Sequence, residues 1–353
     1  SSRAAIDRAL SLQPDLPEAL IVRADWERHV NADYAAAKQD LARVESLQPP
    51  TSQLRFIQTF VERDLGNWTQ ALRYAEDAFQ LDPQNGAYIY GIAVAVHGQH
   101  GDFSGADRFL ARAMAIQGRG LVSAAGLRVY FRVLWRGPKA ALELLDGIPV
   151  VKDEYERREL YRAYCLIALG RVEEAKSALA PIERLLVEDV GEPGLLRWFR
   201  SDPAWALDCL RALGREDVAR ELAIRLRAVT AAELQRGNRS GMIQSLLVKS
   251  QIALGERAEA LRTLEAWRRD NRTISNPFQR TRSNSLAALH YAALDKGDEA
   301  LELLRELRTV GLHTDVSLRY ERDFAAIRSD PRFQELMVAE ETWARAQPDP
   351  IEP

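Results

Sequence analysis

The sequence contains little of what most catalytic, metal-binding or disulfide-stabilised sites need. Only five histidines and two cysteines occur among its 353 residues. Cys165 and Cys209 each stand five residues before a glycine, at matching places in predicted helices. Equivalent positions in stacked helical units are about 10 Å apart, which is beyond the reach of a disulfide. We therefore expect two small buried thiols and no structural disulfide.

Long apolar runs are also missing, and so is an excess of charge of one sign. No stretch approaches the roughly 18 to 20 apolar residues that span a bilayer. The 48 lysines and arginines nearly balance the 51 aspartates and glutamates, and both signs are spread along the chain. A nucleic-acid partner requires a clustered basic face, so none is expected, and the arginines between positions 268 and 282 are interpreted as a solvated face.

No recognisable catalytic motif follows from the residues present. His97 and His100 have a spacing that could share a metal ion, but Gly98 interrupts the helix and no cysteine is nearby. The Gly237–Gly241 loop lacks the Gly-Lys-Ser/Thr ending and the preceding strand of a phosphate-binding loop. We expect no enzymatic activity, no cofactor and no metal site.

What the sequence does contain is a repeat. Turn residues follow successive apolar stretches, at first in steps of 34 and 35 residues. These turn residues are Ala32, Gly66, Gly101, Gly137, Gly170, Gly214, Gly255 and Gly297. An alanine follows most of them by five residues, at Ala37, Ala71, Ala106, Ala175, Ala219 and Ala260. Aromatic residues stand just after the first three turns, and Pro14, Pro49, Pro83 and Gly118 close successive units.

Each repeated position has a physical role. A glycine allows a tight turn at positive φ between two antiparallel helices. Small alanines let helices approach closely, and an aromatic side chain fills the wedge between one helix pair and the next. Proline ends a unit because the residue before it is disfavoured in the helical region. One hairpin cannot bury its apolar face alone, so the hairpins must stack in series.

With this length and this order of Gly, aromatic, Ala, Ala and Pro, the sequence resembles the tetratricopeptide repeat (TPR) family. The resemblance implies an all-α fold, a right-handed superhelical solenoid of about eight helix pairs with a concave inner wall. Residues 1–118 carry the regular repeats, of which the first is truncated. Residues 119–322 carry degenerate, TPR-like repeats of the same solenoid. Residues 323–346 are predicted to form a C-terminal helical cap, and residues 347–353 a flexible tail.

The end of the chain also resembles the ending of bacterial multidomain signalling proteins, among them adenylate cyclases, Ser/Thr kinases and winged-helix membrane transcription regulators. This resemblance implies a non-catalytic scaffold or sensor module within a larger bacterial regulator. Two alternatives remain: a solenoid that senses a small molecule, and an accessory segment of an enzyme whose catalytic domain lies upstream. The cytoplasm is slightly favoured as the compartment, whereas a membrane span upstream of Ser1 would favour the periplasm.

In the TPR architecture the first helix of each pair lines the groove, so the resemblance also implies where a peptide or protein partner would bind. The predicted groove residues are Trp26, Phe56, Phe60, Arg63, Tyr88, Phe131, Trp135, Tyr164 and Lys249, with Val22, Leu127, Trp205 and Tyr291 in the same register. About half of the aromatic rings are expected to fill gaps between helices instead. Chaperone-binding TPR proteins present Lys and Asn here to clamp a C-terminal carboxylate, and the aromatic residues argue against that ligand.

Overall fold

Helices form all of the secondary structure in the residues that the structure describes. The computed structural model describes residues 2–31, 33–85, 101–116, 124–148, 155–188, 202–236, 241–272, 277–309 and 316–347. Within these ranges every element is an α-helix, a 3-10 helix or a π-helical turn, and no strand occurs. The predicted all-α fold class is confirmed.

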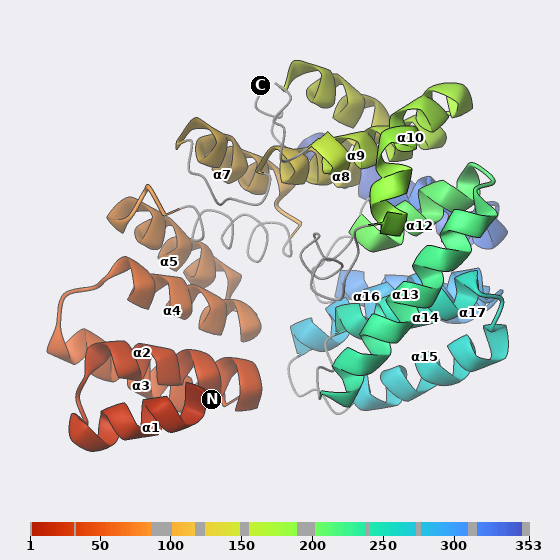
Figure 1. The fold of residues 1–353 in the computed structure, drawn as a ribbon. Helices are drawn as coiled ribbons and strands as arrows, with labels where there is room; N and C mark the ends of the chain where they lie inside the picture. Colours follow the sequence, from red (N-terminus) through yellow and green to blue (C-terminus); the bar gives the residue numbers. More distant parts are fainter. Residues whose placement is uncertain are drawn as a thin grey trace. The chain divides into compact units, whose positions relative to one another are not determined.

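The chain divides into two compact units, Ser1–Ala124 and Ala125–Pro353, which we call unit 1 and unit 2. The helices of unit 1 are α1 (Ser2–Leu12), α2 (Pro17–Trp26), the π-helical η1 (Glu27–Asn31), α3 (Tyr34–Leu47), α4 (Ser52–Asp64), α5 (Trp68–Leu81) and α7 (Phe103–Ile116). Helix α2 packs on α3 and α4 packs on α5, as two successive hairpins (Figure 1). The first helices of these hairpins, α2 and α4, also contact each other.

Unit 2 continues the same pattern of paired helices. Its elements are α8 (Ala124–Gly147), α9 (Tyr155–Ala168), α10 (Val172–Glu188), α12 (Asp202–Ala212), α13 (Glu216–Gln235), α14 (Gly241–Ala253), α15 (Arg257–Arg272), α16 (Pro277–Ala293), α17 (Gly297–Thr309), η4 (Val316–Arg319), η5 (Arg322–Ile327) and α18 (Pro331–Ala346). Helix α8 breaks at Gly137, where φ is 84°, into two helical arms. The later pairs are α9 with α10, α12 with α13, α14 with α15, and α16 with α17.

The turns between paired helices use the predicted glycines. Positive φ angles between 72° and 82° occur at Gly66, Gly101, Gly170, Gly214 and Gly255. The same backbone hydrogen bond closes the turns at Gly66, Gly170, Gly214 and Gly255: at the third of them, the N–H of Arg215 donates to the carbonyl of Leu210 at 2.8 Å. This bond satisfies a carbonyl that the helix end would otherwise leave unpaired, and it requires a left-handed residue at the turn.

The last turn departs from the prediction, because Gly297 is not its left-handed residue. That residue is Asp295, with φ of 63°, and Lys296 closes the turn by donating to the carbonyl of Tyr291 at 2.8 Å. Gly297 begins α17 instead. A β-carbon at Gly297 would lie 2.5 Å from the Ile327 side chain, so glycine at this position lets η5 lie against α17.

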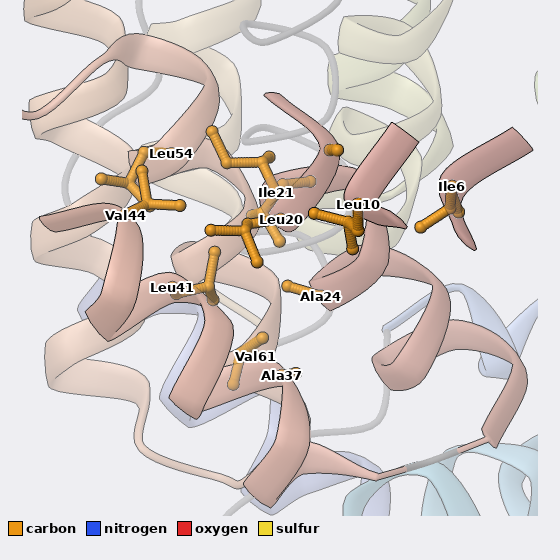
Figure 2. Close-up of a cluster of buried hydrophobic side chains, with 12 residues drawn as sticks. Ile6, Leu10, Leu20, Ile21, Ala24, Ala37, Leu41, Val44, Leu54 and Val61 are labelled. Carbon is orange, nitrogen blue, oxygen red and sulfur yellow. The ribbon is translucent and has the colours of Figure 1, made fainter. Parts of the chain in front are cut away.

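The repeat alanines are buried, as the stacking of helix pairs predicts. Ala37, Ala71, Ala106, Ala175, Ala219 and Ala260 are each at most 2% exposed. In unit 1, Ala37 belongs to a core that α1, α2, α3 and α4 share (Figure 2). Its labelled residues are Ile6, Leu10, Leu20, Ile21, Ala24, Ala37, Leu41, Val44, Leu54 and Val61. Both cysteines are buried free thiols, as predicted.

Proline marks several helix starts. Pro203 is the second residue of α12, and Pro277 and Pro331 are the first residues of α16 and α18. Asp330 caps α18 by accepting a hydrogen bond from the N–H of Arg332 at 2.8 Å. No described helix is long and apolar enough to cross a membrane.

Several predicted features lie outside the described residues. They are the turn residue Ala32, the groove residue Tyr88, the histidines His97 and His100, the closing residue Gly118, the loop positions 237–240 and the tail from 348 to 353.

We predict that Gly214→Ala lowers the free energy of unfolding by about 1 kcal/mol, because a β-carbon is strained at positive φ. An added β-carbon meets no atom within 4 Å, so the loss comes from the backbone alone. The matched variant Asp295→Gly should change the free energy of unfolding by less than about 0.5 kcal/mol. Glycine relieves the backbone strain at this position, and this gain offsets the greater conformational freedom that glycine gives to the unfolded chain. Denaturant titration of both variants measures the difference, and equal losses would contradict this account.

Ala71→Leu should lower the free energy of unfolding by about 1 to 3 kcal/mol, because the extra carbons overpack a contact between helices. Ala71 is 0% exposed. Ala35→Leu, at an exposed position of α3, is the matched control and should leave the melting temperature nearly unchanged. An unchanged melting curve for Ala71→Leu would show that Ala71 is not at a close helix contact.

Candidate interaction surfaces

Four of the predicted groove residues, together with Val22, lie on the first helices of the two unit 1 hairpins. Val22 and Trp26 are one turn apart on α2, and Phe56, Phe60 and Arg63 follow the same spacing on α4. Helix α2 contacts α4. Most of the apolar core residues of the two helices, among them Leu20, Ala24, Leu54 and Val61, occupy the opposite side. We call these five residues the unit 1 wall.

The apolar side chains of the unit 1 wall are anchored on the core and remain partly exposed. Val22 is 41% exposed, and Trp26, Phe56 and Phe60 are partly buried. Trp26 and Phe56 pack against the core cluster of unit 1. The rings of Phe56 and Phe60 meet edge to face, with centroids 4.7 Å apart. Such rings keep apolar surface for a partner while losing little conformational freedom on binding.

A buried ion-pair network supports Phe60 from the side. The Asp64 carboxylate has no exposed side-chain surface. It accepts hydrogen bonds from Nε of Arg63 at 2.8 Å and from Nη1 of Arg28 at 3.0 Å. Arg28 also donates to Asp25 at 2.7 Å. The two guanidinium groups lie 4.8 and 5.2 Å from the centroid of the Phe60 ring, so cation–π attraction adds to the ion pairs.

Arg63 differs from its predicted role. It is predicted to line the groove and bind a partner, but its side chain is only 11% exposed and its guanidinium holds Asp64. Burial lowers the pKa of Arg63, and the neighbouring Asp64 opposes that shift. The carboxylate that pairs with Arg63 is therefore the next residue of its own helix. That adjacency is visible in the sequence and is the signal that points to an internal ion pair.

The remaining predicted groove residues that the structure describes lie on first helices of unit 2, but they are buried. Phe131 and Trp135 on α8 and Tyr164 on α9 are 4%, 1% and 6% exposed. The Lys249 side chain on α14 is 12% exposed. The structure corrects the expectation that these residues present an open groove surface. Tyr88 is not among the described residues, so its role stays a prediction.

Three of these residues contact the end of the chain itself. Nε1 of Trp135 donates to the Ala344 carbonyl at 3.1 Å, and the Tyr164 hydroxyl donates to Glu321 at 2.8 Å. Lys249 pairs with Asp323 at 2.9 Å. We call Val316–Gln347, which comprises η4, η5 and α18, the C-terminal segment. A C-terminal cap would be expected to contact only the last hairpin. This segment contacts the earlier helices α8, α9 and α14 as well.

Aromatic rings fill the space between α9 and α12. Tyr164 stacks on Trp205 with centroids 4.2 Å apart and planes 5° from parallel. Tyr161 meets the same indole edge to face at 5.1 Å, and Tyr130 lies 5.3 Å from it. This packing is the role that we expect for about half of the aromatic residues in the groove register.

Charged groups gather at the centre of unit 2. Nζ of Lys249 lies 2.7 Å from Asp208 and 2.9 Å from Asp323, and all three side chains are nearly buried. Burial opposes the charge of Lys249, but the two aspartates outweigh it and raise the pKa of the lysine. Burial raises the pKa of Asp208 to about 6. Burial and repulsion by Asp208 raise the pKa of Glu321 to about 8, so Glu321 is mostly protonated at neutral pH.

His290 lies in the same region as a neutral side chain. Its Nε2 lies 2.8 Å from the Ser245 hydroxyl, and burial lowers its pKa to about 3. Acids, a base and hydroxyl groups thus lie close together, as they do in active sites, but here each of them is buried. The C-terminal segment covers the cluster. The hydrogen bond from Tyr164 and the ion pair with Lys249 hold the segment on α9 and α14. Within the described ranges, no three His, Cys, Asp or Glu residues are placed to share a metal ion.

Comparison with known proteins shows only distant structural likeness. No family model matches the sequence, and no curated protein matches it. A chain in the structure of Naa15/Naa10 bound to HypK-THB aligns with a TM-score of 0.32 and 12% identity, covering 98% of this chain and 60% of that one. The TPR domain of P58(IPK) aligns with a TM-score of 0.23 and 14% identity, covering 97% and 92%. The chain therefore spans 60% of the length of the first of these structures.

We predict that Asp64→Asn lowers the free energy of unfolding by about 2 kcal/mol or more, because it leaves two nearly buried guanidinium groups without their shared carboxylate. Asp77→Asn on α5 is the matched control. Asp77 is 43% exposed and lies 3.7 Å from Arg55, so its loss should change the free energy by less than about 0.5 kcal/mol. Denaturant titration checks both, and a loss no larger for Asp64→Asn than for the control would contradict the prediction.

Proposed function

We propose that the chain is a non-catalytic protein-interaction module whose unit 1 wall binds a peptide or partner protein through apolar anchor side chains. One observation carries the proposal. Three aromatic rings and Val22 lie on neighbouring first helices. Trp26 and Phe56 pack against the core, and all four side chains keep exposed surface. Aromatic side chains held in this way provide much of the binding energy of protein interfaces.

The charges around the wall indicate what kind of partner fits. The guanidinium groups of Arg28 and Arg63 are already neutralised by Asp25 and Asp64. The wall therefore provides apolar area rather than a clamp for a free carboxylate. An amphipathic helix or an extended peptide with apolar anchors at helical or alternating spacing suits such a surface. A terminal carboxylate, the ligand of chaperone-binding TPR proteins, does not.

A scaffold or sensor role within a larger bacterial regulator follows from the resemblance of the sequence to such proteins, and is part of the proposal. One hollow of unit 2 does not suit a small-molecule sensor. It has a volume of about 390 Å³ and is lined by Glu265, Arg268, Arg269, Tyr291, Glu299, Glu302 and Leu303. Small-molecule sites are lined mainly by apolar side chains, whereas this lining is mostly charged.

The proposal predicts that Phe56→Ala with Phe60→Ala weakens peptide binding by about 2 kcal/mol or more, which is about thirtyfold in Kd. The probes are peptides selected on the full chain from a random display library, with affinities measured by calorimetry. Circular dichroism should show unchanged helicity. Leu81→Ala, at a 51% exposed position of α5, is the matched control and should bind as the unaltered chain does.

A second variant covers the case in which the double variant unfolds. Val22→Asp changes a 41% exposed side chain on α2 and should preserve the fold while placing a charge in the apolar surface. It should weaken the same peptides by at least about tenfold, or about 1.4 kcal/mol. Unchanged affinity for both variants, or affinity that only follows the folded fraction, would refute the proposed surface.

A further inference from the structure

Residues 320–327 of the C-terminal segment cross unit 2 from hairpin to hairpin in chain order, and the end of α18 then returns to α8 through Ala344 and Gln347. The ring of Tyr320 lies beside Gly137 of α8, 3.7 Å from where a β-carbon would stand. Glu321 then accepts the hydrogen bond from α9, Asp323 pairs with α14, and Ile327 lies against α17. Helix η5 also packs along α16. Four residues within a stretch of eight thus contact successive hairpins.

Most of these contacts fall on the first helix of a pair. We call the first arm of α8 with α9, α12, α14 and α16 the unit 2 wall. Nη1 and Nη2 of Arg136, in the first arm of α8, donate to the carbonyls of Ala344 and Gln347 at 2.6 and 3.0 Å. The side chains that the sequence selects as groove-lining, Trp135, Tyr164 and Lys249, contact this segment. The segment therefore occupies the place of a groove ligand.

We propose that the C-terminal segment is an intramolecular ligand of the unit 2 wall, and that it opens as one body when negative charge accumulates around Lys249. In the closed state the segment keeps other ligands from that wall. The opening does not depend on whether the unit 1 wall binds a partner, so the two proposals can fail separately.

The balance of charge in the cluster supports an opening of this kind. Three carboxyl groups, from Asp208, Glu321 and Asp323, surround one lysine. The groups that face Glu321 and its neighbours come from every element packed there: Tyr164 and Cys165 on α9, Asp208, Cys209 and Arg211 on α12, Lys249 on α14, His290 on α16 and Asp323 on η5. Burial raises the pKa of both thiols and keeps His290 neutral, so these groups add no positive charge near neutral pH.

The direction of the pH dependence follows from Glu321. Its pKa is about 8 when the segment is docked, against an ordinary value of 4.5 when the carboxyl meets water. Between these values the docked state holds a proton that the open state releases, so opening becomes more favourable as pH rises and levels off above about 8. Asp208 contributes in the same direction below its pKa of about 6. Between pH 6 and 8 one proton is linked, which increases the opening constant about tenfold per pH unit.

Hydrogen exchange of the full chain tests this, because exchange protection reports local opening. Mass spectrometry at pH 6, 7 and 8, corrected for the intrinsic exchange rate, should show the protection of η5 and α18 falling about tenfold per pH unit. The amides of α9 and α14 should keep their protection. Glu321→Gln keeps a neutral side chain of the same shape, so it should preserve the protection of the segment and remove its pH dependence.

Glu321→Gln should keep the segment docked, whereas Lys249→Met should open it. Lys249→Met removes the one cation between Asp208 and Asp323 and should lower the protection of the segment at least tenfold at every pH. Lys176→Met, at an exposed position of α10, is the matched control and should have no effect. Two results would show that the C-terminal segment is a permanent part of the core. One is protection of the segment that does not depend on pH in the unaltered chain, and the other is protection that falls together with that of α9 and α14. A dimer formed by exchange of the segment, detected by light scattering, would also overturn the intramolecular assignment.

Discussion

A single helical hairpin cannot bury its own apolar side, and the rest of this structure depends on that constraint. The hairpins must approach each other closely, and a buried alanine such as Ala71 or Ala219 provides the small side chain that close approach requires. The first helices of successive hairpins contact one another, α2 with α4 in unit 1 and α9, α12, α14 and α16 in turn in unit 2, so each unit has a surface formed by first helices. The apolar side chains on such a surface are either covered by an occupant or stay partly exposed. In unit 1 they stay partly exposed, whereas in unit 2 the C-terminal segment covers them.

Both walls contain a buried charge held between two groups of opposite sign. In unit 1 the Asp64 carboxylate lies between Arg28 and Arg63, and in unit 2 the Lys249 ammonium lies between Asp208 and Asp323. A buried pair contributes little net stability, but removing one member leaves an uncompensated charge. Such groups therefore fix geometry more than they add stability. In unit 1 they fix an aromatic ring, whereas in unit 2 they fix a segment of chain.

Much of the fold could be predicted because its signals are local in the sequence. Contacts between residues far apart in the sequence could not be predicted. Turn glycines and repeat alanines act within one or two helices, so their spacing gives the hairpins and even places Lys249 on a first helix. Its partner Asp323 is 74 residues away, with no periodic spacing to reveal it. Gly297 is predicted as a turn residue because glycine is the usual one, yet Asp295 adopts the left-handed conformation. The glycine is required by Ile327, a contact that only the folded chain creates.

The order in which residues 320–327 meet the hairpins gives the unit 2 wall a polarity. Tyr320 lies at α8, Asp323 at α14 and Ile327 at α17, so over this stretch the chain direction follows the order of the repeats. The wall thus distinguishes the two ends of what it holds. A peptide with the same residues in reverse order would place its acidic groups against different helices, away from the only ammonium described in that cluster. A peptide of the same composition would therefore not make the same contacts unless its chain ran in the same direction along the wall.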